Sequence, residues 1–192
     1  IELNIDKVYR YGVFSQRKKN YLGVTEDGNV DIKGLVGKKS STPKFVKQAF
    51  HDMISILSKV RNEEEFNSAV ASIKSMMNDY VEKLMNRQLS LEELAFDVML
   101  SKPVDNYDKN TPQHVKAAKQ LERMLGIKAR AGDIISYVKV KTGVKPVKMA
   151  RIEEIDLEKY LSVMKATFEQ VLDPLGIEIE PPRRSLKLKD FM

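Results

Sequence analysis

The spacing of the apolar residues changes near residue 40, and this change divides the chain into a β part and a helical part. Before it, three short β-rich runs cover residues 8–14, 21–24 and 30–32. The pair Asp27-Gly28 lies between the last two runs and supplies the positive φ that a tight hairpin turn needs. The sequence therefore predicts a small antiparallel β meander at this end of the chain.

Apolar residues recur at helical spacing after residue 41. Thr42-Pro43 and Thr111-Pro112 are each typical of an N-cap followed by proline at the first helical position. A capping box at Asn62 predicts a long helix that runs to Leu84. We expect helices after each of these three signals, the first reaching Val60.

Further signals predict the rest of the second part. A capping box at Ser90 predicts a short helix that contains Leu94. Gly126 is typical of a helix C-terminus, residues 134–140 read as a β segment, and Asp156 is expected to cap a last helix that ends at Leu172. The expected fold class is α+β, a small antiparallel meander followed by a mainly helical part with one short β segment.

Composition excludes several classes of site. The chain has 192 residues, no cysteine and two histidines, which removes disulfide scaffolds, thiolate zinc sites and cysteine nucleophiles and argues against a histidine metal site. No apolar run approaches the roughly 20 residues that cross a bilayer, and the first residues lack a signal-peptide pattern. We expect a cytoplasmic protein without a membrane contact.

Charge is unevenly distributed along the chain, although the formal net charge is only +6. Residues 7–48 carry +7 and residues 101–151 carry +8, whereas residues 49–100 carry −4 and residues 152–180 carry −6. Two basic blocks favour two positive surfaces that face one polyanion. The alternative is a solvated surface whose charge is merely uneven.

Catalytic motifs are missing from the sequence. It has no Gly-rich phosphate loop, no Gly-x-Ser-x-Gly elbow and no His-Glu-x-x-His. The acidic runs at residues 63–65 and 92–93 are typical of first helical turns, where the dipole favours them. We therefore expect no catalytic residue, no metal ligand and no cofactor on this chain.

Three clusters of basic residues have the composition expected for contacts with a polyanion. Lys18 and Lys19 precede Tyr21 at the start of a predicted strand, where alternation would send Lys19 and Tyr21 to one face. Residues 38–42 and 109–114 each place lysine just before a helix N-terminus, where free N–H groups and the dipole favour phosphate. A purely structural helix cap is the alternative at both of these clusters.

These residues resemble the late palm and thumb of family B DNA polymerases, most closely the archaeal enzymes of crenarchaeal type. Lys18-Lys19-Asn20-Tyr21 is similar to the Lys-Lys-x-Tyr motif at the palm–thumb junction, and residues 31–34 with Lys38-Lys39 are similar to the next strand and basic turn. Matches in the thumb follow in order at Leu94, Leu100, Tyr107, residues 111–115, Ala118, residues 132–138, Asp156, Tyr160 and Phe168. The resemblance covers roughly residues 1–177.

The resemblance implies a polymerase component without its catalytic centre. The two catalytic aspartate motifs, the nucleotide-binding helix and the exonuclease carboxylates of the family are missing here. The chain is then a small subunit or a C-terminal fragment, and a larger partner chain carries the catalytic palm, fingers and exonuclease together with Mg²⁺. The alternative is a non-catalytic DNA-binding or clamp-tethering protein that descends from a polymerase.

The resemblance also implies a set of DNA contacts. The residues expected to contact primer–template DNA are Lys18, Lys19, Tyr21, Lys38, Lys39, Thr42, Asn110, Thr111, His114, Lys128, Arg130 and Lys148. The first three would lie near the minor groove and backbone of the primer end, and those from Asn110 onward would follow the duplex backbone. His114 is equally compatible with a helix-face residue satisfied by a neighbour.

The implied organisation has three parts. Residues 1–40 form the last palm strands, residues 41–180 the thumb, and residues 181–192 a flexible tail. The tail resembles a sliding-clamp interaction box in which Ser185 stands for the usual glutamine and Leu188, Phe191 and Met192 form the apolar plug. A frayed terminus that packs on its own thumb is the alternative. Such a protein would be cytoplasmic and associated with the nucleoid.

Overall fold

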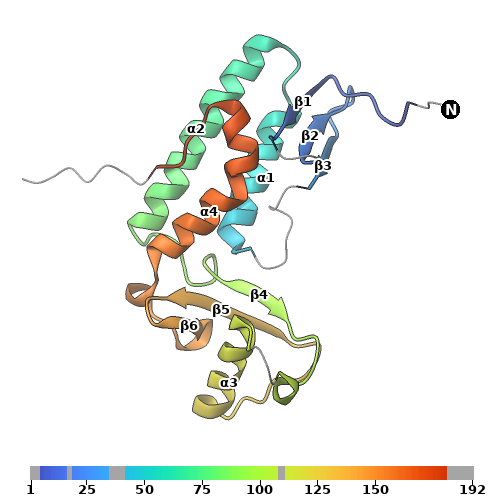
Figure 1. Ribbon diagram of the computed structural model, residues 1–192. Helices are drawn as coiled ribbons and strands as arrows, with labels where there is room; N and C mark the ends of the chain where they lie inside the picture. The colour runs from blue at the N-terminus through green and yellow to red at the C-terminus, as the bar shows by residue number, and fades with distance from the viewer. Residues whose placement is uncertain (1–4, 17–18, 35–41, 108–110, 181–192) are drawn as a thin grey trace, which may run out of the picture.

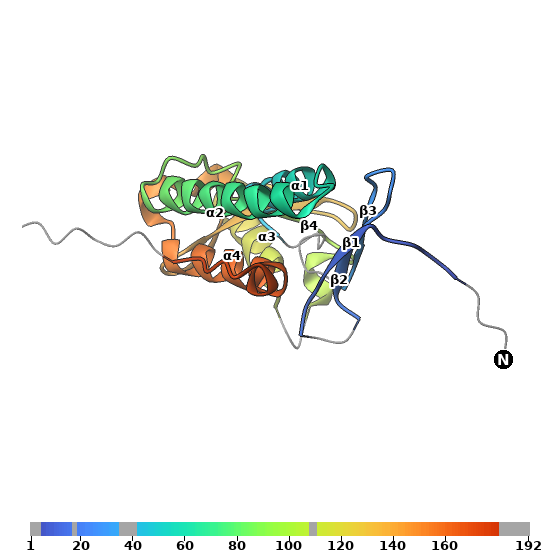
Figure 2. The same ribbon diagram turned by 90° about the horizontal axis from the view of Figure 1, so that it is seen from above.

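Three helices form a bundle that carries one small sheet at its side and another at its end (Figure 1). The computed structural model describes residues 5–16, 19–34, 42–107 and 111–180. α1 (Lys44–Ser58), α2 (Glu63–Met85) and α4 (Leu157–Leu172) pack against one another. Figure 2 shows α1 and α2 on one side of the bundle and α4 on the other.

The N-terminal strands form the expected meander. β1 (Tyr11–Phe14), β2 (Tyr21–Val24) and β3 (Val30–Lys33) pair antiparallel in that order. Gly28 adopts a φ of 84° in the β2–β3 turn, as the Asp-Gly pair predicts. Val13, Leu22 and Val24 point to the same face of the sheet and are buried. The opposite face, which we call the open face, carries the exposed Phe14 and Lys33. The first strand begins at Tyr11 and is shorter than the expected run of residues 8–14, so Val8 and Tyr9 lie outside it.

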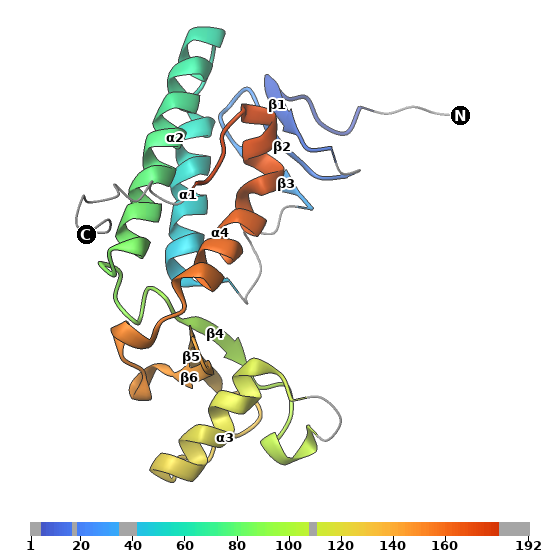
Figure 3. The same ribbon diagram turned by 60° about the vertical axis from the view of Figure 1, so that its left-hand side comes forward.

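A second sheet lies at the lower end of the bundle, with α3 (Gln113–Leu125) on its far side (Figure 3). β4 (Phe96–Met99), β5 (Ile134–Val140) and β6 (Gly143–Pro146) pair antiparallel in that order. We call residues 96–149 the tip module. It contains two short 3₁₀ turns, η2 (Val104–Asn106) and η3 (Val147–Met149), while η4 (Ile152–Glu154) and η5 (Asp173–Leu175) flank α4.

The mixed fold agrees with the expected class, but the tip module corrects one detail. We expected one short β segment, and the structure has three paired strands. Phe96 lies opposite Tyr137 in the β4–β5 register, and their rings stack with centroids 5.3 Å apart. Two strands were therefore not expected. β6 follows β5 directly along the chain, whereas β4 is four residues long and its partner is far away in sequence, so no local pattern identifies β4.

Helix starts are predicted to within a residue or two, with one exception. Asn62 and Asp156 accept the backbone N–H groups of Glu65 and Lys159, as expected for N-caps. α1 and α3 begin just after their prolines, without a side-chain cap from Thr42 or Thr111. The predicted short helix after Ser90 is wrong.

The Ser90 capping box forms, but no helix follows it. Glu93 and Ser90 exchange the two expected side-chain to backbone hydrogen bonds. The following residues make a turn, because Phe96 is already paired in β4. Leu94 is buried at the end of this turn.

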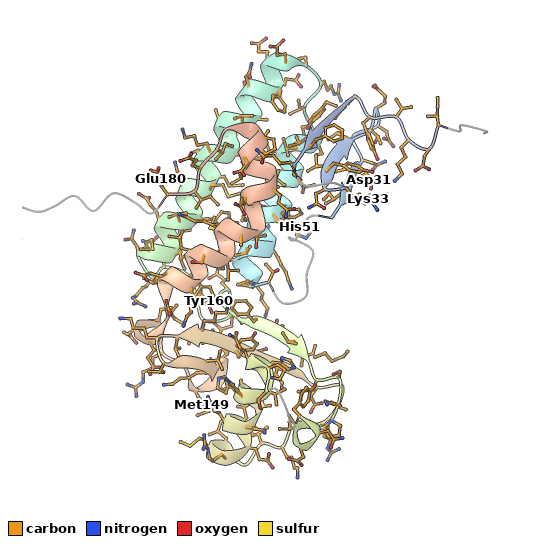
Figure 4. All side chains as sticks on the ribbon, in the orientation of Figure 1. Asp31, Lys33, His51, Met149, Tyr160 and Glu180 are labelled. Atoms are coloured by element: carbon orange, nitrogen blue, oxygen red, sulfur yellow. The ribbon has the colours of Figure 1, made fainter. Side chains whose placement is uncertain are left out.

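Tyr160 joins the bundle to the tip module, where Figure 4 labels it at the lower end of α4. Its side chain is fully buried, and its ring contacts those of Phe45 and Phe96. The hydroxyl donates to the carbonyl oxygen of Leu94 at 2.8 Å and accepts from the backbone N–H of Lys139 at 3.0 Å. One side chain thereby satisfies buried polar groups from two other segments.

We expect Tyr160→Phe to lower the free energy of unfolding by about 2 to 4 kcal/mol, because it leaves two buried polar groups without partners. Urea denaturation followed by circular dichroism measures the loss. Tyr107→Phe is the matched control, because the partner of the Tyr107 hydroxyl among the described residues is the exposed Ser101 Oγ, and it should change stability by less than about 0.5 kcal/mol. Equal losses for the two variants would contradict the joining role of Tyr160.

Candidate nucleic-acid interface

The described candidate residues fall into two groups. Lys19 and Tyr21 belong to the meander, whereas Thr111, His114, Lys128, Arg130 and Lys148 belong to the tip module. Thr42 lies between the groups, just before α1. The other candidates lie outside the described residues, and these are Lys18, Lys38, Lys39, Asn110, Ser185, Leu188, Phe191 and Met192.

The open face of the meander combines rings and charges. The register places Phe14, Tyr21 and Lys33 side by side on the three strands, and neighbouring side chains alternate between the two faces. Phe14 is 65% exposed. Figure 4 labels Asp31 and Lys33 at the part of the meander that lies away from the helices. A face of this kind can contact sugars and bases as well as phosphates.

Lys19 lies in the β1–β2 turn and not in the strand that we expected. Its φ of 66° is in the left-handed region, where a non-glycine residue is strained. Asn20 holds the turn against α4, because its Nδ2 donates to Gln170 Oε1 at 2.9 Å. A Cβ on Gly34 would lie 2.9 Å from the Lys19 carbonyl oxygen, so a glycine is required beside the turn. The exposed Lys19 is therefore presented on a turn held from two sides.

Tyr21 is part of a polar network on the open face. The Tyr9 hydroxyl donates to Asp31 Oδ2 at 2.6 Å and lies 3.4 Å from the Tyr21 hydroxyl. Lys7 Nζ is 2.7 Å from the same carboxylate oxygen. The hydrogen bonds from Lys7 and then Tyr9 hold the pKa of Asp31 below its usual value, and the bond to Asp31 raises the pKa of Tyr9.

Thr42 is less accessible than the sequence suggests. It is only 4% exposed, and the backbone N–H of Phe45 in the first turn of α1 donates to the carbonyl oxygen of Glu93. A phosphate at this helix start would compete with that hydrogen bond.

The start of α3 presents Thr111 and His114 near an aromatic side chain. The His114 ring meets the Tyr107 ring edge to face, with centroids 6.2 Å apart. Burial lowers the pKa of His114, which favours the neutral imidazole over the charged one. Lys102 Nζ lies 4.6 Å from the centroid of the same Tyr107 ring and supplies a cation that the sequence interpretation missed.

Lys128 and Lys148 come together although they are distant in sequence. Both line a shallow cavity of about 330 Å³ whose wall includes Ile127 and Ile134. Lys128 is 71% exposed, and its Nζ is 3.8 Å from Glu122 Oε1. Such a long, exposed ion pair is weak, so the ammonium group remains accessible to another anion. The exposed Arg130 lies in the same loop, which Asp133 fixes by accepting the Arg130 backbone N–H at 2.7 Å.

α3 separates the two contact groups of the tip module. Its 13 residues span about 20 Å at 1.5 Å per residue. Thr111 and His114 lie at its start, and Lys128 and Arg130 follow its end at Gly126, whose φ of 68° stops the helix. Contacts at both ends of α3 match a ligand with charges repeated along its length.

Neither a metal-ligand cluster nor a membrane-spanning helix is found in the part of the chain that the structure describes. No three His, Asp or Glu side chains gather there in a way that could hold a metal ion. None of the described helices is long and apolar enough to span a membrane.

Comparison with known proteins finds relatives that are all DNA polymerases in the examples below. The family model "DNA polymerase family B" matches residues 1–177. DNA polymerase 1 of Saccharolobus solfataricus is 45% identical over 193 residues, which cover 100% of this chain and 22% of the relative. DNA polymerase 1 of Aeropyrum pernix is 46% identical over 179 residues, which cover 92% of this chain and 19% of the relative.

A solved structure agrees with these matches. The family B DNA polymerase from the hyperthermophilic archaeon Pyrobaculum calidifontis aligns with a TM-score of 0.66 and 26% identity, over 93% of this chain and 23% of that chain. The chain thus spans about a fifth of the length of these relatives. With a family match over most of its residues and a matching fold, the chain belongs to family B of the DNA polymerases.

Proposed function

We propose that this chain acts as the late palm and thumb of a family B DNA polymerase and binds primer–template duplex DNA. The observation that carries the proposal is the placement of Lys128 and Lys148 around one cavity of the tip module. Both side chains are exposed, and neighbouring cations on one surface bind a phosphate backbone. The resemblance of residues 111–115 and 132–138 to thumb motifs supports the same assignment.

The meander would contact the primer end. Lys18, Lys19 and Tyr21 resemble the motif at the palm–thumb junction, and the exposed Lys19 lies next to Asn20, which is hydrogen-bonded to Gln170 of α4. An ammonium group near the minor groove follows its shape without reading sequence, as a polymerase requires. Lys38 and Lys39 would contact the DNA backbone, whereas Thr42, which is only 4% exposed, would not take part.

The tip module would follow the duplex behind the primer end. Asn110, Thr111 and His114 at the start of α3, and Lys128, Arg130 and Lys148 beyond its end, would contact phosphates about 20 Å apart. His114 would contribute a hydrogen bond to this contact, and its lowered pKa favours the neutral imidazole.

Catalysis would belong to a larger partner chain. Two-metal phosphoryl transfer needs carboxylates that hold Mg²⁺, and the described residues do not provide them. The partner would supply the catalytic palm, the fingers and the exonuclease, and this chain would be inactive alone. Together the chains would act at the nucleoid.

A non-catalytic DNA-binding or clamp-tethering protein is the second candidate, and it too is compatible with the lack of a metal-ligand cluster among the described residues. Gel filtration with the larger polymerase chain distinguishes the two functions. A stoichiometric complex that gains primer extension supports the first, whereas DNA binding with neither complex nor extension supports the second.

Lys19→Ala is expected to weaken binding to primer–template DNA at every sequence tested. One lost phosphate contact should lower the slope of log K against log[salt] by about 0.9. Fluorescence anisotropy over a salt series measures both quantities. Lys74→Ala is the control, because it removes an exposed lysine from α2 with the same change in net charge. Unchanged affinity and slope for Lys19→Ala would overturn the meander contact.

A further inference from the structure

A single hydrogen bond between side chains joins the β1–β2 turn to α4. Asn20 Nδ2 donates to Gln170 Oε1 at 2.9 Å, although 150 positions separate the two residues along the chain. Gln170 is only 9% exposed and is one of three polar side chains that are buried among the described residues. A buried amide without a partner costs free energy, so the contact with Asn20 makes a glutamine tolerable at this position.

Asn20 is also held from two other directions. Its carbonyl oxygen accepts the backbone N–H of Ser15 at 3.1 Å, which closes the hairpin. Gly34, which follows β3, has a φ of 71°, and a Cβ at this position would collide with Asn20 Oδ1. The place of Asn20 is therefore set by β1, by the chain after β3 and by α4 together.

Lys19 is the residue that depends on this arrangement. It directly precedes Asn20, and its φ of 66° is costly for a residue with a Cβ. Strained backbone conformations persist only where the surrounding structure holds them. Lys19 is exposed, so burial of its own side chain does not supply that support. The contacts of Asn20 hold the lysine in a conformation that an isolated turn would leave.

α4 connects this turn to the tip module. Figures 1 and 3 both show the C-terminal end of α4 beside the meander and its other end above the second sheet. Tyr160, near the start of the helix, accepts the backbone N–H of Lys139 in the tip module. Gln170 lies ten positions further along the same helix, which corresponds to about 15 Å. One helix thereby fixes the separation between the two groups of candidate DNA contacts.

We propose that Gln170 is a positioning residue, which holds the Lys19 turn on α4 so that the meander and the tip module engage one DNA duplex together. The inference rests on the proposed function, because it needs Lys19 to contact DNA. Gln170 acts through Asn20 and does not touch the ligand, since it is buried. Two contact groups with a fixed separation bind one ligand more tightly than two groups that move independently.

A double-mutant cycle with Lys19→Ala tests the proposal. Gln170→Met keeps the length and burial of the side chain but removes the acceptor for Asn20. It should weaken binding to primer–template DNA by about five- to tenfold, the cost of holding a left-handed lysine without support, and should lower the salt slope toward that of Lys19→Ala. The variant Lys19→Ala/Gln170→Met should bind no more weakly than Lys19→Ala, because a missing ammonium group cannot be misplaced. Fluorescence anisotropy over a salt series measures all three variants.

A matched control on the same helix separates positioning from a general loss of structure. Thr167 is 3% exposed, and its Oγ1 donates to the carbonyl oxygen of Val163 at 2.8 Å, within α4. Thr167→Val should leave DNA affinity and salt slope unchanged. Amide exchange of Ser15 should become faster in Gln170→Met and not in Thr167→Val. If both variants weaken DNA binding equally, Gln170 has only a structural role.

The outcomes distinguish the inference from the function beneath it. If Lys19→Ala weakens binding but Gln170→Met does not, or if the two losses multiply in the double variant, the positioning role is wrong and the DNA contact of Lys19 stands. If Lys19→Ala has no effect, the meander contact and the inference both fail. The contacts of the tip module are then still tested separately, through Lys128 and Arg130.

Discussion

The double variant Lys128→Ala/Arg130→Ala is expected to flatten the dependence of log K on log[salt] by about one to two units. Both side chains are exposed in the loop after α3, and Lys128 shares a cavity with Lys148. Fewer phosphate contacts release fewer counterions, so the loss of affinity should be greatest at low salt.

A matched variant makes this result specific to the tip module. Lys74→Ala/Lys165→Ala removes two exposed lysines from α2 and α4 and changes the net charge by the same amount. Its salt slope should equal that of the unchanged chain. Identical slopes for both double variants would show that the loop after α3 does not contact the backbone.

Deleting residues 185–192 is expected to abolish clamp-stimulated synthesis by the assembled polymerase. The segment, which lies outside the described residues, resembles a clamp interaction box with Leu188, Phe191 and Met192 as its apolar plug. A tether raises the local concentration of the enzyme on DNA, by about 10²- to 10⁴-fold in avidity for linked modules, without changing the chemical step.

Unstimulated synthesis should therefore persist in the deletion variant. Primer extension with and without the clamp measures both activities on the same preparation. Ser185→Gln is a useful companion, because it restores the residue usual at that position of the box and should strengthen stimulation. Clamp stimulation that survives the deletion would mean that residues 185–192 are not the tether.

Local sequence signals predicted the elements whose stabilising contacts are themselves local. The Asp27-Gly28 turn and the caps at Asn62 and Asp156 depend on residues three or four positions away, and all three form. β4 was missed because it depends on β5, whose Tyr137 lies opposite Phe96 across the tip module. The same pairing explains why a completed capping box at Ser90 starts no helix.

The sequence predicts which residues belong to the candidate site, but it does not predict how their side chains are placed. Lys19 was expected on a strand face, and its left-handed φ in a turn depends on Asn20, Gln170 and the space at Gly34. The partners of Tyr21 were also missed. The hairpin turn sets the register of β2 and β3, which places Gly23 opposite Asp31. A glycine beside a carboxylate leaves space for a third side chain, and this signal in the sequence could have identified the network on the open face.

The contacts that cover the inner face of the meander also determine when it can fold. Tyr11 Oη donates to the carbonyl oxygen of Leu57, 46 positions along the chain, and the Asn20 contact with Gln170 spans 150 positions. Bringing such distant segments together costs loop entropy before any contact repays it, and long-range contacts slow folding. We therefore expect the apolar inner side chains Val13, Leu22 and Val24 to be covered only after α1 and α4 have formed. Until then, an unprotected meander of this kind is prone to aggregation.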